Sequence, residues 1–251
     1  MAGVEGRVAL VTGAGRGIGR EVAELLASRG ACVMAVARSE KELAAVGLEF
    51  TVADLGTVEG CELAVSQTEQ RLGTIEIFVC NHGIGSARER VIWEQDTEHW
   101  DETMRVNLDG PFHLARLILK GMVERRYGRA VFTSSTAGEH AEHAGSAYNS
   151  SKHGLLGLMR SVAQDGGAFG VTSNAVLPGW VRTEMAERSA RAEAQKRSIT
   201  PEQVWEERAA LYPPGRVATS REVAEMIAFL ASEESSGVSG QAITVALGGI
   251  W

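Results

Sequence analysis

The segment Arg7-Val8-Ala9-Leu10-Val11-Thr12-Gly13-Ala14-Gly15-Arg16-Gly17-Ile18-Gly19 joins an apolar run to a glycine-rich run. Its apolar part, residues 7–11, predicts a short buried strand. After the glycines, apolar residues recur at the spacing of one helix face, at Ile18, Val22, Leu25 and Leu26. The sequence therefore predicts a strand, a glycine turn and a helix over 18–28, in that order.

Glycines in such a turn let the backbone bend tightly and approach a ligand closely. The N-terminus of the following helix then lies where a pyrophosphate can bind. The spacing Gly13-x-x-x-Gly17-x-Gly19 differs from the G-x-G-x-x-G of the general dinucleotide fingerprint. Two interpretations stay open at this point: a nucleotide-binding loop, and a glycine turn with a purely structural role.

Short apolar runs alternate with helical stretches along the rest of the chain. The candidate strands are residues 8–12, 32–37, 50–52, 75–80, 130–133, 172–177 and 242–245. This alternation implies right-handed βαβ units and an α/β fold with a parallel sheet of these seven strands. The interval between Arg38 and Asp54 is short, so its helix is expected to be a turn or two around 40–46. Neither a repeat nor a linker interrupts the pattern, and residues 1–251 are expected to form a single domain.

The run Ser146-Ala147-Tyr148-Asn149-Ser150-Ser151-Lys152 carries a phenol and an ammonium group four residues apart. On a helix, side chains at i and i+4 share a face. A positive neighbour favours the phenolate, so we expect Lys152 to lower the pKa of Tyr148. A phenol tuned toward neutral pH can give or take a proton at a carbonyl or an alcohol. Taken alone, the pair could equally be an incidental one on a solvated helix face.

Two further polar residues accompany this pair. Ser135 lies thirteen residues before Tyr148 and ends the segment 129–135, which is a strand that runs into a polar end. Ligands of open α/β sheets bind beyond the carboxyl ends of the strands, so this hydroxyl can reach a bound carbonyl. The alternative is a serine that only bonds its own turn. Asn107 lies inside a long helical stretch, where an amide is usually a surface residue.

Composition narrows the class of protein. The 251 residues are 44% hydrophobic, which is enough for a large core, and the length fits one α/β domain. A net charge of −7 argues against a nucleic-acid-binding surface. No N-terminal stretch resembles a signal peptide, and no run reaches the roughly 18 apolar residues of a membrane span. The three cysteines, Cys32, Cys61 and Cys80, are expected to be reduced and buried, which indicates a cytoplasmic protein.

From about Gly6 to the C-terminus, the chain resembles the short-chain dehydrogenase/reductase family. The family's T-G-x-x-x-G-x-G motif matches residues 12–19, and its N-N-A-G motif is partly matched by Cys80-Asn81-His82-Gly83. Its Pro-Gly motif after the sixth strand matches Pro178-Gly179. The motifs occur in the family's order and at its spacing. The resemblance implies a Rossmann-type, doubly wound sheet flanked by helices, and an NAD(P)-dependent oxidoreductase.

The resemblance also implies the chemistry. The family's catalytic tetrad matches Asn107, Ser135, Tyr148 and Lys152. A hydride would pass between a nicotinamide and a ketone, an aldehyde or a secondary alcohol, including 3-oxoacyl-type substrates. Ser135 would hydrogen-bond the carbonyl oxygen, Tyr148 would protonate it, and Lys152 would lower the tyrosine pKa and bind the nicotinamide ribose. Asn107 would hold a water that links Lys152 to solvent.

A longer set of residues is implied to bind the cofactor. It comprises Gly13, Gly15, Arg16, Gly17, Ile18, Gly19, Arg38, Asp54, Leu55, Asn81, Gly83, Tyr148, Lys152, Pro178, Gly179, Val181 and Thr183. Ala37 stands where the family's NAD-binding aspartate would lie. With no carboxylate to repel it, a 2′-phosphate could bind Arg38 and Arg16 through charge-assisted bonds. We therefore favour NADP(H); if both arginines are surface residues, NAD(H) is the alternative.

The substrate side carries fewer motifs. In the family, the helical region that corresponds to residues 183–212 covers the substrate, and its apolar underside could come from Met185, Val204, Trp205 and Leu211. Trp180 is expected to line the substrate site, or else to belong to the core. His82 replaces a small residue of the family motif and could narrow the nicotinamide side of the pocket or only pack.

The run Glu139-His140-Ala141-Glu142-His143 invites a metal-binding interpretation. It lacks a spacing such as H-E-x-x-H on a helix, so no metal is expected. His140 and His143 are instead expected to line the substrate pocket, with plain solvation as the alternative.

Assembly follows from the resemblance and from the general frequency of closed symmetric assemblies: a homo-oligomer is expected, most simply a tetramer with twofold axes. The ending Val245-Ala246-Leu247-Gly248-Gly249 departs from the family's V-D-G-G. The expected partner is a small-molecule substrate, with neither nucleic acid nor membrane involved. The alternative function is a non-catalytic or regulatory dinucleotide-binding protein on the same fold, which would have no need of the whole tetrad.

Overall fold

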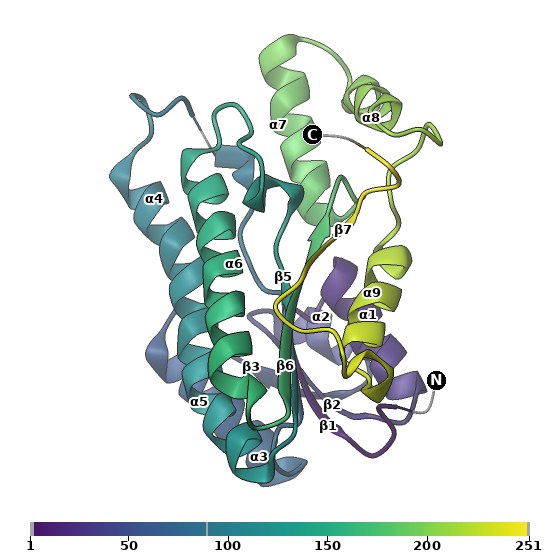
Figure 1. Ribbon diagram of the computed structural model, residues 1–251. Helices are drawn as coiled ribbons and strands as arrows, with labels where there is room; N and C mark the ends of the chain where they lie inside the picture. Colours follow the sequence, from purple (N-terminus) through teal and green to yellow (C-terminus); the bar gives the residue numbers. More distant parts are fainter. Residues whose placement is uncertain (1–2, 89, 250–251) are drawn as a thin grey trace.

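The computed structural model describes residues 3–88 and 90–249, and its central feature is a sheet of seven parallel strands (Figure 1). The strands are β1 (Val8–Thr12), β2 (Cys32–Ala37), β3 (Glu49–Val52), β4 (Ile77–Cys80), β5 (Gly128–Thr133), β6 (Val171–Pro178) and β7 (Ala242–Val245). Their order across the sheet is β3-β2-β1-β4-β5-β6-β7. The chain order therefore reverses beside β1, which pairs with both β2 and β4. The doubly wound α/β prediction is confirmed.

Helices cover both faces of the sheet (Figure 1). They are α1 (Gly17–Ser28), α2 (Glu40–Ala44), α3 (Val58–Arg71), α4 (Thr97–Met104), α5 (Gly110–Arg125), α6 (Ser146–Gly167), α7 (Glu184–Arg197), α8 (Pro201–Ala210) and α9 (Ser220–Leu230). One core lies under α1 and α9, and a second lies under α3, α5 and α6. Each fully buried Leu or Val in them contributes about 1.5–3 kcal/mol. The short helix expected after Arg38 is α2.

Two predicted strand starts were wrong by two residues, while β3 begins one residue earlier than predicted and β6 is one residue longer at each end. The fifth strand was expected to begin at Ala130, because an arginine reads as an exposed residue. It begins at Gly128, and Arg129 is only 5% exposed. Its guanidinium donates to the carbonyl oxygens of Ser232, Gly128 and Gly170, which offsets part of the cost of burial. The fourth strand starts at Ile77, two residues later than expected.

The cysteine prediction is partly wrong. All three thiols are free, and Cys61 and Cys80 are buried, but Cys32 is exposed. It is the first residue of β2, whereas the next four residues of the strand are buried. Within the described ranges, no helix combines the length and the apolar character that crossing a bilayer requires.

Candidate active site

A pocket of about 460 Å³ opens beyond the carboxyl ends of the strands. Its walls come from the segments that follow β1, β2, β3, β4, β5 and β6, together with the start of α7. The pocket includes the point beside β1 where the strand order reverses, and ligands of doubly wound sheets bind at such a point.

The glycine turn after β1 has both a structural role and an open binding surface. Gly13 and Gly17 have φ angles of 66° and 56°, which favour glycine. A Cβ at Gly19 would collide with the carbonyl oxygen of Gly13, so the turn also needs glycine for close packing. Helix α1 follows directly, and the side chain of its N-cap residue, Arg16, makes no capping hydrogen bond. Its backbone N–H groups are therefore available at the pocket, as a pyrophosphate site requires.

Thr12 ties the end of β1 to the end of β4. Its hydroxyl oxygen accepts hydrogen bonds from the backbone of Asn81 at 2.9 Å and of His82 at 3.2 Å. The same hydroxyl donates to the carbonyl of Val79 at 3.2 Å. This network fixes the backbone of Asn81 and His82 at the pocket, and Asn81 and Gly83 both line it.

The imidazole of His82 faces inward, which answers the question that the sequence left open. Its Nδ1 lies 2.9 Å from the hydroxyl oxygen of Thr12, and its ring lies against Gly110. The residue borders the pocket, but its Nε2 is buried and has no hydrogen-bond partner among the described residues. Burial, with a contribution from the charge of Lys152, lowers the pKa of His82 to about 3.

The low pKa of His82 predicts a loss of stability in acid. In the unfolded chain His82 has a pKa near 6.5 and is protonated below that pH. In the folded chain it stays neutral down to about pH 3. The free energy of unfolding should therefore fall by about 1.4 kcal/mol per pH unit on going below pH 6. His82→Ala should remove this slope, whereas His140→Ala, at an exposed position, should keep it. Urea titrations at pH 7 and pH 5 measure the difference; equal slopes in the His82→Ala variant and the wild type would contradict the assignment.

Asn107 is buried, contrary to the expectation for an amide within a helix. It lies in a π-helical stretch, Arg105–Asp109, between α4 and α5, and is 1% exposed. Its Oδ1 accepts from the backbone of Ile84 at 2.8 Å. Its Nδ2 donates to the Ile84 carbonyl at 3.0 Å and to the hydroxyl of Ser151 at 3.1 Å. Burial is tolerated because the amide is bonded at both ends, and it joins the 83–84 segment to α6.

Ser135, Tyr148 and Lys152 converge on the pocket. Ser135 follows β5, and its side chain is hydrogen-bonded to that of Tyr148. Lys152 is 5% exposed, and its Nζ donates to the carbonyl of Thr133 at 3.0 Å. The Nζ lies 5.7 Å from the centre of the Tyr148 ring. The helix therefore places the two side chains on one face, as their spacing predicted.

The electrostatics of this pair differ from the prediction. Burial raises the pKa of Tyr148 to about 12, the Ser135 hydrogen bond opposes that rise, and the charge of Glu142 adds to it. Burial likewise lowers the pKa of Lys152 to about 8. The expected lowering of the tyrosine pKa was wrong because the loss of hydration outweighs the hydrogen bond with Ser135, and Lys152 is not among the causes of the shift. At neutral pH the phenol is therefore protonated and able to donate.

The two arginines beside Ala37 differ in their ion pairing. Arg16 lies near two carboxylates, at 3.0 Å from Glu42 and 3.1 Å from Glu184. Arg38 is exposed, lines the pocket and has no ion-pair partner in the described part of the chain. Arg38 is thus the better placed of the two to receive a phosphate, since Arg16 would have to share its charge with two acids.

Of the remaining predicted cofactor residues, Gly19 is buried and lies outside the pocket lining, whereas the others line the pocket. These are Gly15, Ile18, Asp54, Leu55, Pro178, Gly179, Val181 and Thr183. The carboxylate of Asp54 accepts a hydrogen bond from the backbone of Gly56 at 3.0 Å. The hydroxyl of Thr183 accepts from the backbone of Ala186 at 3.3 Å and so caps α7.

Trp180 belongs both to the pocket wall and to a small core under α7 and α8. Its ring meets that of Trp205 edge to face, with centroids 6.4 Å apart. The guanidinium carbon of Arg208 lies 3.5 Å from the centre of the Trp180 ring. The backbone N–H of Trp180 donates to the phenol oxygen of Tyr212 at 2.6 Å. Both expectations for Trp180, pocket lining and core, therefore hold together.

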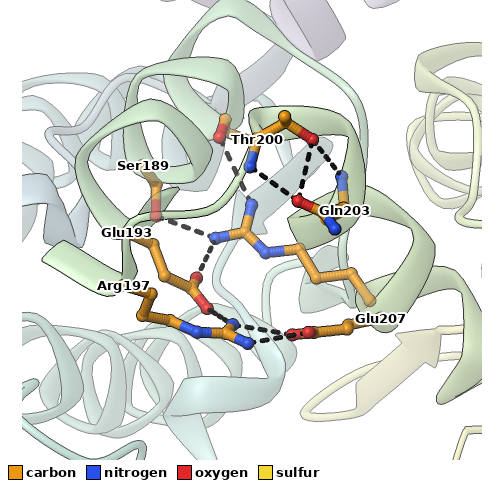
Figure 2. Close-up of polar contacts among 8 residues, drawn as sticks. Ser189, Glu193, Arg197, Thr200, Gln203 and Glu207 are labelled. Carbon is orange, nitrogen blue, oxygen red and sulfur yellow. Dashed lines mark hydrogen bonds and ion pairs between the residues drawn. The ribbon is translucent and has the colours of Figure 1, made fainter. Parts of the chain in front are cut away.

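Helices α7 and α8 are locked to one another by charged side chains (Figure 2). Arg197 bridges Glu193 at 2.7 Å and Glu207 at 2.6 Å. The buried Arg208 donates to Glu193 at 3.0 Å and to Ser189 at 3.2 Å. The segment 183–212 is thus a helical hairpin beside the pocket. Val204 and Trp205 are buried in it and Met185 faces the pocket, but Leu211 is 55% exposed and does not belong to the apolar underside.

One residue of the run from Glu139 to His143 lines the pocket. That residue is Glu142, whereas His140 and His143 are exposed and lie outside the pocket lining. Across the described residues, no three His, Cys, Asp or Glu side chains are grouped so that they could hold a metal ion. The sequence pattern drew attention to the histidines because imidazole is reactive; it held no signal that would have singled out Glu142.

Comparison with known proteins agrees with this geometry. The family model described as enoyl-(acyl carrier protein) reductase matches residues 13–249. Over 250 residues, the chain is 32% identical to the 3-oxoacyl-[acyl-carrier-protein] reductase FabG of Escherichia coli (strain K12), with 96% of each chain covered. It is 35% identical to the monensin polyketide synthase putative ketoacyl reductase of Streptomyces virginiae, with 95% of each covered.

Two solved structures are similar throughout. Levodione reductase superimposes with a TM-score of 0.93 at 31% identity, over 97% of both chains. A point variant of actinorhodin polyketide ketoreductase with NADPH gives 0.90 at 33% identity, over 97% of this chain and 98% of that one. With a matching family model over nearly the whole length and relatives above 30% identity, this chain belongs to the short-chain dehydrogenase/reductase family.

Proposed function

We propose that this protein is an NADPH-dependent carbonyl reductase that also runs in reverse on secondary alcohols. One observation carries the proposal. A continuous pocket joins the N-terminus of α1 and the exposed Arg38 at one end to Ser135, Tyr148 and Lys152 at the other. The names of the relatives support it, because they include 3-oxoacyl and polyketide ketoreductases and one structure with NADPH.

The residues present fit a dinucleotide. The α1 N-terminus would hold the pyrophosphate, Asp54 and Leu55 would flank the adenine, and Arg38 would bind the 2′-phosphate. Asn81, Gly83 and the segment from Pro178 to Thr183 would surround the nicotinamide. When bound, NADPH supplies the hydride for the carbonyl carbon.

Within this proposal, side chains of the protein stabilise the developing charge and donate the proton. Ser135 donates a hydrogen bond to the carbonyl oxygen and stabilises the negative charge that develops there. Tyr148, protonated at neutral pH, donates its proton to the same oxygen. Lys152 keeps one bond to Thr133 and offers its remaining hydrogens to the nicotinamide ribose hydroxyls.

Asn107 takes a positioning role in this proposal. Its side chain is hydrogen-bonded to Ile84 and Ser151, and a Cβ on Gly83 would lie 3.1 Å from its Oδ1 and 3.7 Å from the Nζ of Lys152. It thereby holds the 83–84 segment beside Lys152. The relay water that the family resemblance implies would have to bind next to these groups.

The direct test follows NADPH absorbance at 340 nm with a panel of neutral ketones, aldehydes and diketones. We expect oxidation that depends on both substrate and enzyme, and the reverse reaction with NADP⁺ and a secondary alcohol. Ser135→Ala should lose most of this activity, because the oxyanion loses a donor. A wild-type protein that binds NADPH but oxidises it with no member of the panel would favour the non-catalytic alternative.

We further propose a homotetramer with twofold axes in the cytoplasm. Free cysteines fit a reducing compartment, and closed symmetric assemblies are common. Trp100 on α4 is 37% exposed and Phe112 on α5 is 48% exposed, and such large apolar side chains are the kind that subunit contacts cover.

Light scattering should therefore give about four times the chain mass of 26.8 kDa at micromolar concentration. Phe112→Asp should lower that mass, because a carboxylate would be buried at the contact. Phe169→Asp, at a 37% exposed position on another part of the chain, is the control and should leave the mass unchanged. A monomeric wild type would refute the assembly.

A further inference from the structure

The charged side chains that line the pocket are unevenly distributed. Its glycine-loop side is lined by Arg16, Arg38, Glu42, Asp54 and Glu184. Among these, Arg16 forms ion pairs with both Glu42 and Glu184. Lys152 is buried in the pocket base and bonded to Thr133. In the loop between Ser135 and Tyr148, the ionisable residue that reaches the pocket is Glu142. The reacting end of the site therefore carries a carboxylate.

Glu142 is held in place by α6. Its backbone carbonyl accepts a hydrogen bond from Nδ2 of Asn149 at 2.9 Å, and Asn149 is only 9% exposed. Asn149 directly follows Tyr148, so the loop is anchored next to the phenol. Glu142 and Tyr148 line the same pocket, and the charge of Glu142 adds to the rise in the pKa of Tyr148 that burial causes. The residue as a whole is exposed, but partial loss of hydration at the carboxyl group raises the pKa of Glu142.

Arg208, the cation of the helical hairpin 183–212 whose charge acts on Glu142, is already engaged. Arg208 lies against the ring of Trp180 and donates to Glu193, to Ser189 and to the carbonyl of Ala186. Arg208 lowers the pKa of Glu142 but does not line the pocket. Among the described residues that line the substrate side, Trp180, Met185, Ala186 and Ser189 are uncharged. An anionic group on a substrate would thus meet the carboxylate of Glu142, whereas the ammonium group at this end, Lys152, is buried in the pocket base and bonded to Thr133.

We propose that Glu142 acts as a charge filter, by which the site selects uncharged carbonyl compounds, such as keto esters and diketones, over free keto acids. This inference rests on the proposed reductase function. Two negative charges brought together in a partly desolvated pocket repel one another, and such repulsion discriminates between ligands of the same shape. The ester and the acid of one 3-oxo compound differ in this charge, so they form the appropriate pair.

The experiment compares ethyl 3-oxobutanoate with 3-oxobutanoate by kcat/KM, with saturating NADPH at pH 7.5. The wild type should prefer the ester by about tenfold or more, as expected for two like charges at an effective dielectric constant near 20. Glu142→Gln should reduce this preference several-fold, chiefly by lowering KM for the acid. Glu139→Gln, at an exposed position outside the pocket, is the matched control and should keep the wild-type ratio. Higher salt should weaken the preference in the wild type more than in Glu142→Gln.

Binding measurements separate this inference from the function. Calorimetry with NADP⁺ present gives Kd for the same ester and acid without turnover. An ester preference that shrinks in Glu142→Gln supports the filter even if NADPH is not oxidised, a result that would count against the reductase alone. Active enzyme with an unchanged ester-to-acid ratio in Glu142→Gln overturns the filter and leaves the reductase standing.

Discussion

Tyr148→Phe is expected to remove nearly all turnover while leaving cofactor binding largely intact. The hydroxyl of Tyr148 is hydrogen-bonded to Ser135 at the pocket, and burial keeps it protonated at neutral pH. The ring itself only packs, so phenylalanine fills the same space and removes only the proton donor. General acid–base groups typically contribute ~10²–10⁴-fold in rate, and kcat should fall by a factor in that range.

A matched substitution separates chemistry from stability. Tyr127 is also a tyrosine with a buried hydroxyl, but it lies at the opposite end of β5 from Ser135, beneath Arg7 and Arg129. Tyr127→Phe should therefore keep kcat within about twofold, since no group at the reacting end changes. NADPH affinity, measured by fluorescence, should be close to that of the wild type in both variants. Retention of most of kcat by Tyr148→Phe would remove Tyr148 as the acid.

Features that depend on local sequence could be predicted well. The apolar runs from Val8 and Cys32 became strands with the expected bounds, because a buried parallel strand needs a continuous apolar stretch. The i, i+4 spacing placed Tyr148 and Lys152 on one helix face, since that geometry is a property of the helix itself. The short interval after Arg38 likewise limited α2 to five residues.

Features that depend on tertiary surroundings could not be predicted. The pKa of Tyr148 rises because other segments bury the phenol, and no spacing within α6 reports that burial. Arg16 is neutralised by Glu184, which lies 168 positions further along the chain. Asn107 is buried because Ile84 and Ser151 meet it from two other segments. In each case the deciding partner is distant in sequence, so a motif can name the residue but not its state.

The second large effect concerns the cofactor corner. Arg38→Ala should weaken NADPH binding by about tenfold to hundredfold, and NADH binding far less. The two cofactors differ only in the 2′-phosphate, so Arg38 discriminates between them only if it touches that group. Losing a hydrogen bond to a charged group costs roughly 1.5–3 kcal/mol, which converts to that range of affinity. The exposure and the lack of an ion-pair partner among the described residues make Arg38 free to bind the phosphate.

Ala37→Asp should shift the preference toward NADH. A carboxylate at the end of β2 would repel the phosphate and offer the ribose 2′-hydroxyl an acceptor. The double substitution should exceed either single one, because Arg16 shares its charge with Glu42 and Glu184 and can compensate for Arg38 only in part. Calorimetry at fixed salt gives Kd for both cofactors, since phosphate contacts are screened by ions. An equal loss of affinity for NADPH and NADH in Arg38→Ala would mean that the arginine does not recognise the phosphate, and the choice of NADPH would then have to come from Arg16 or from the backbone of the glycine turn.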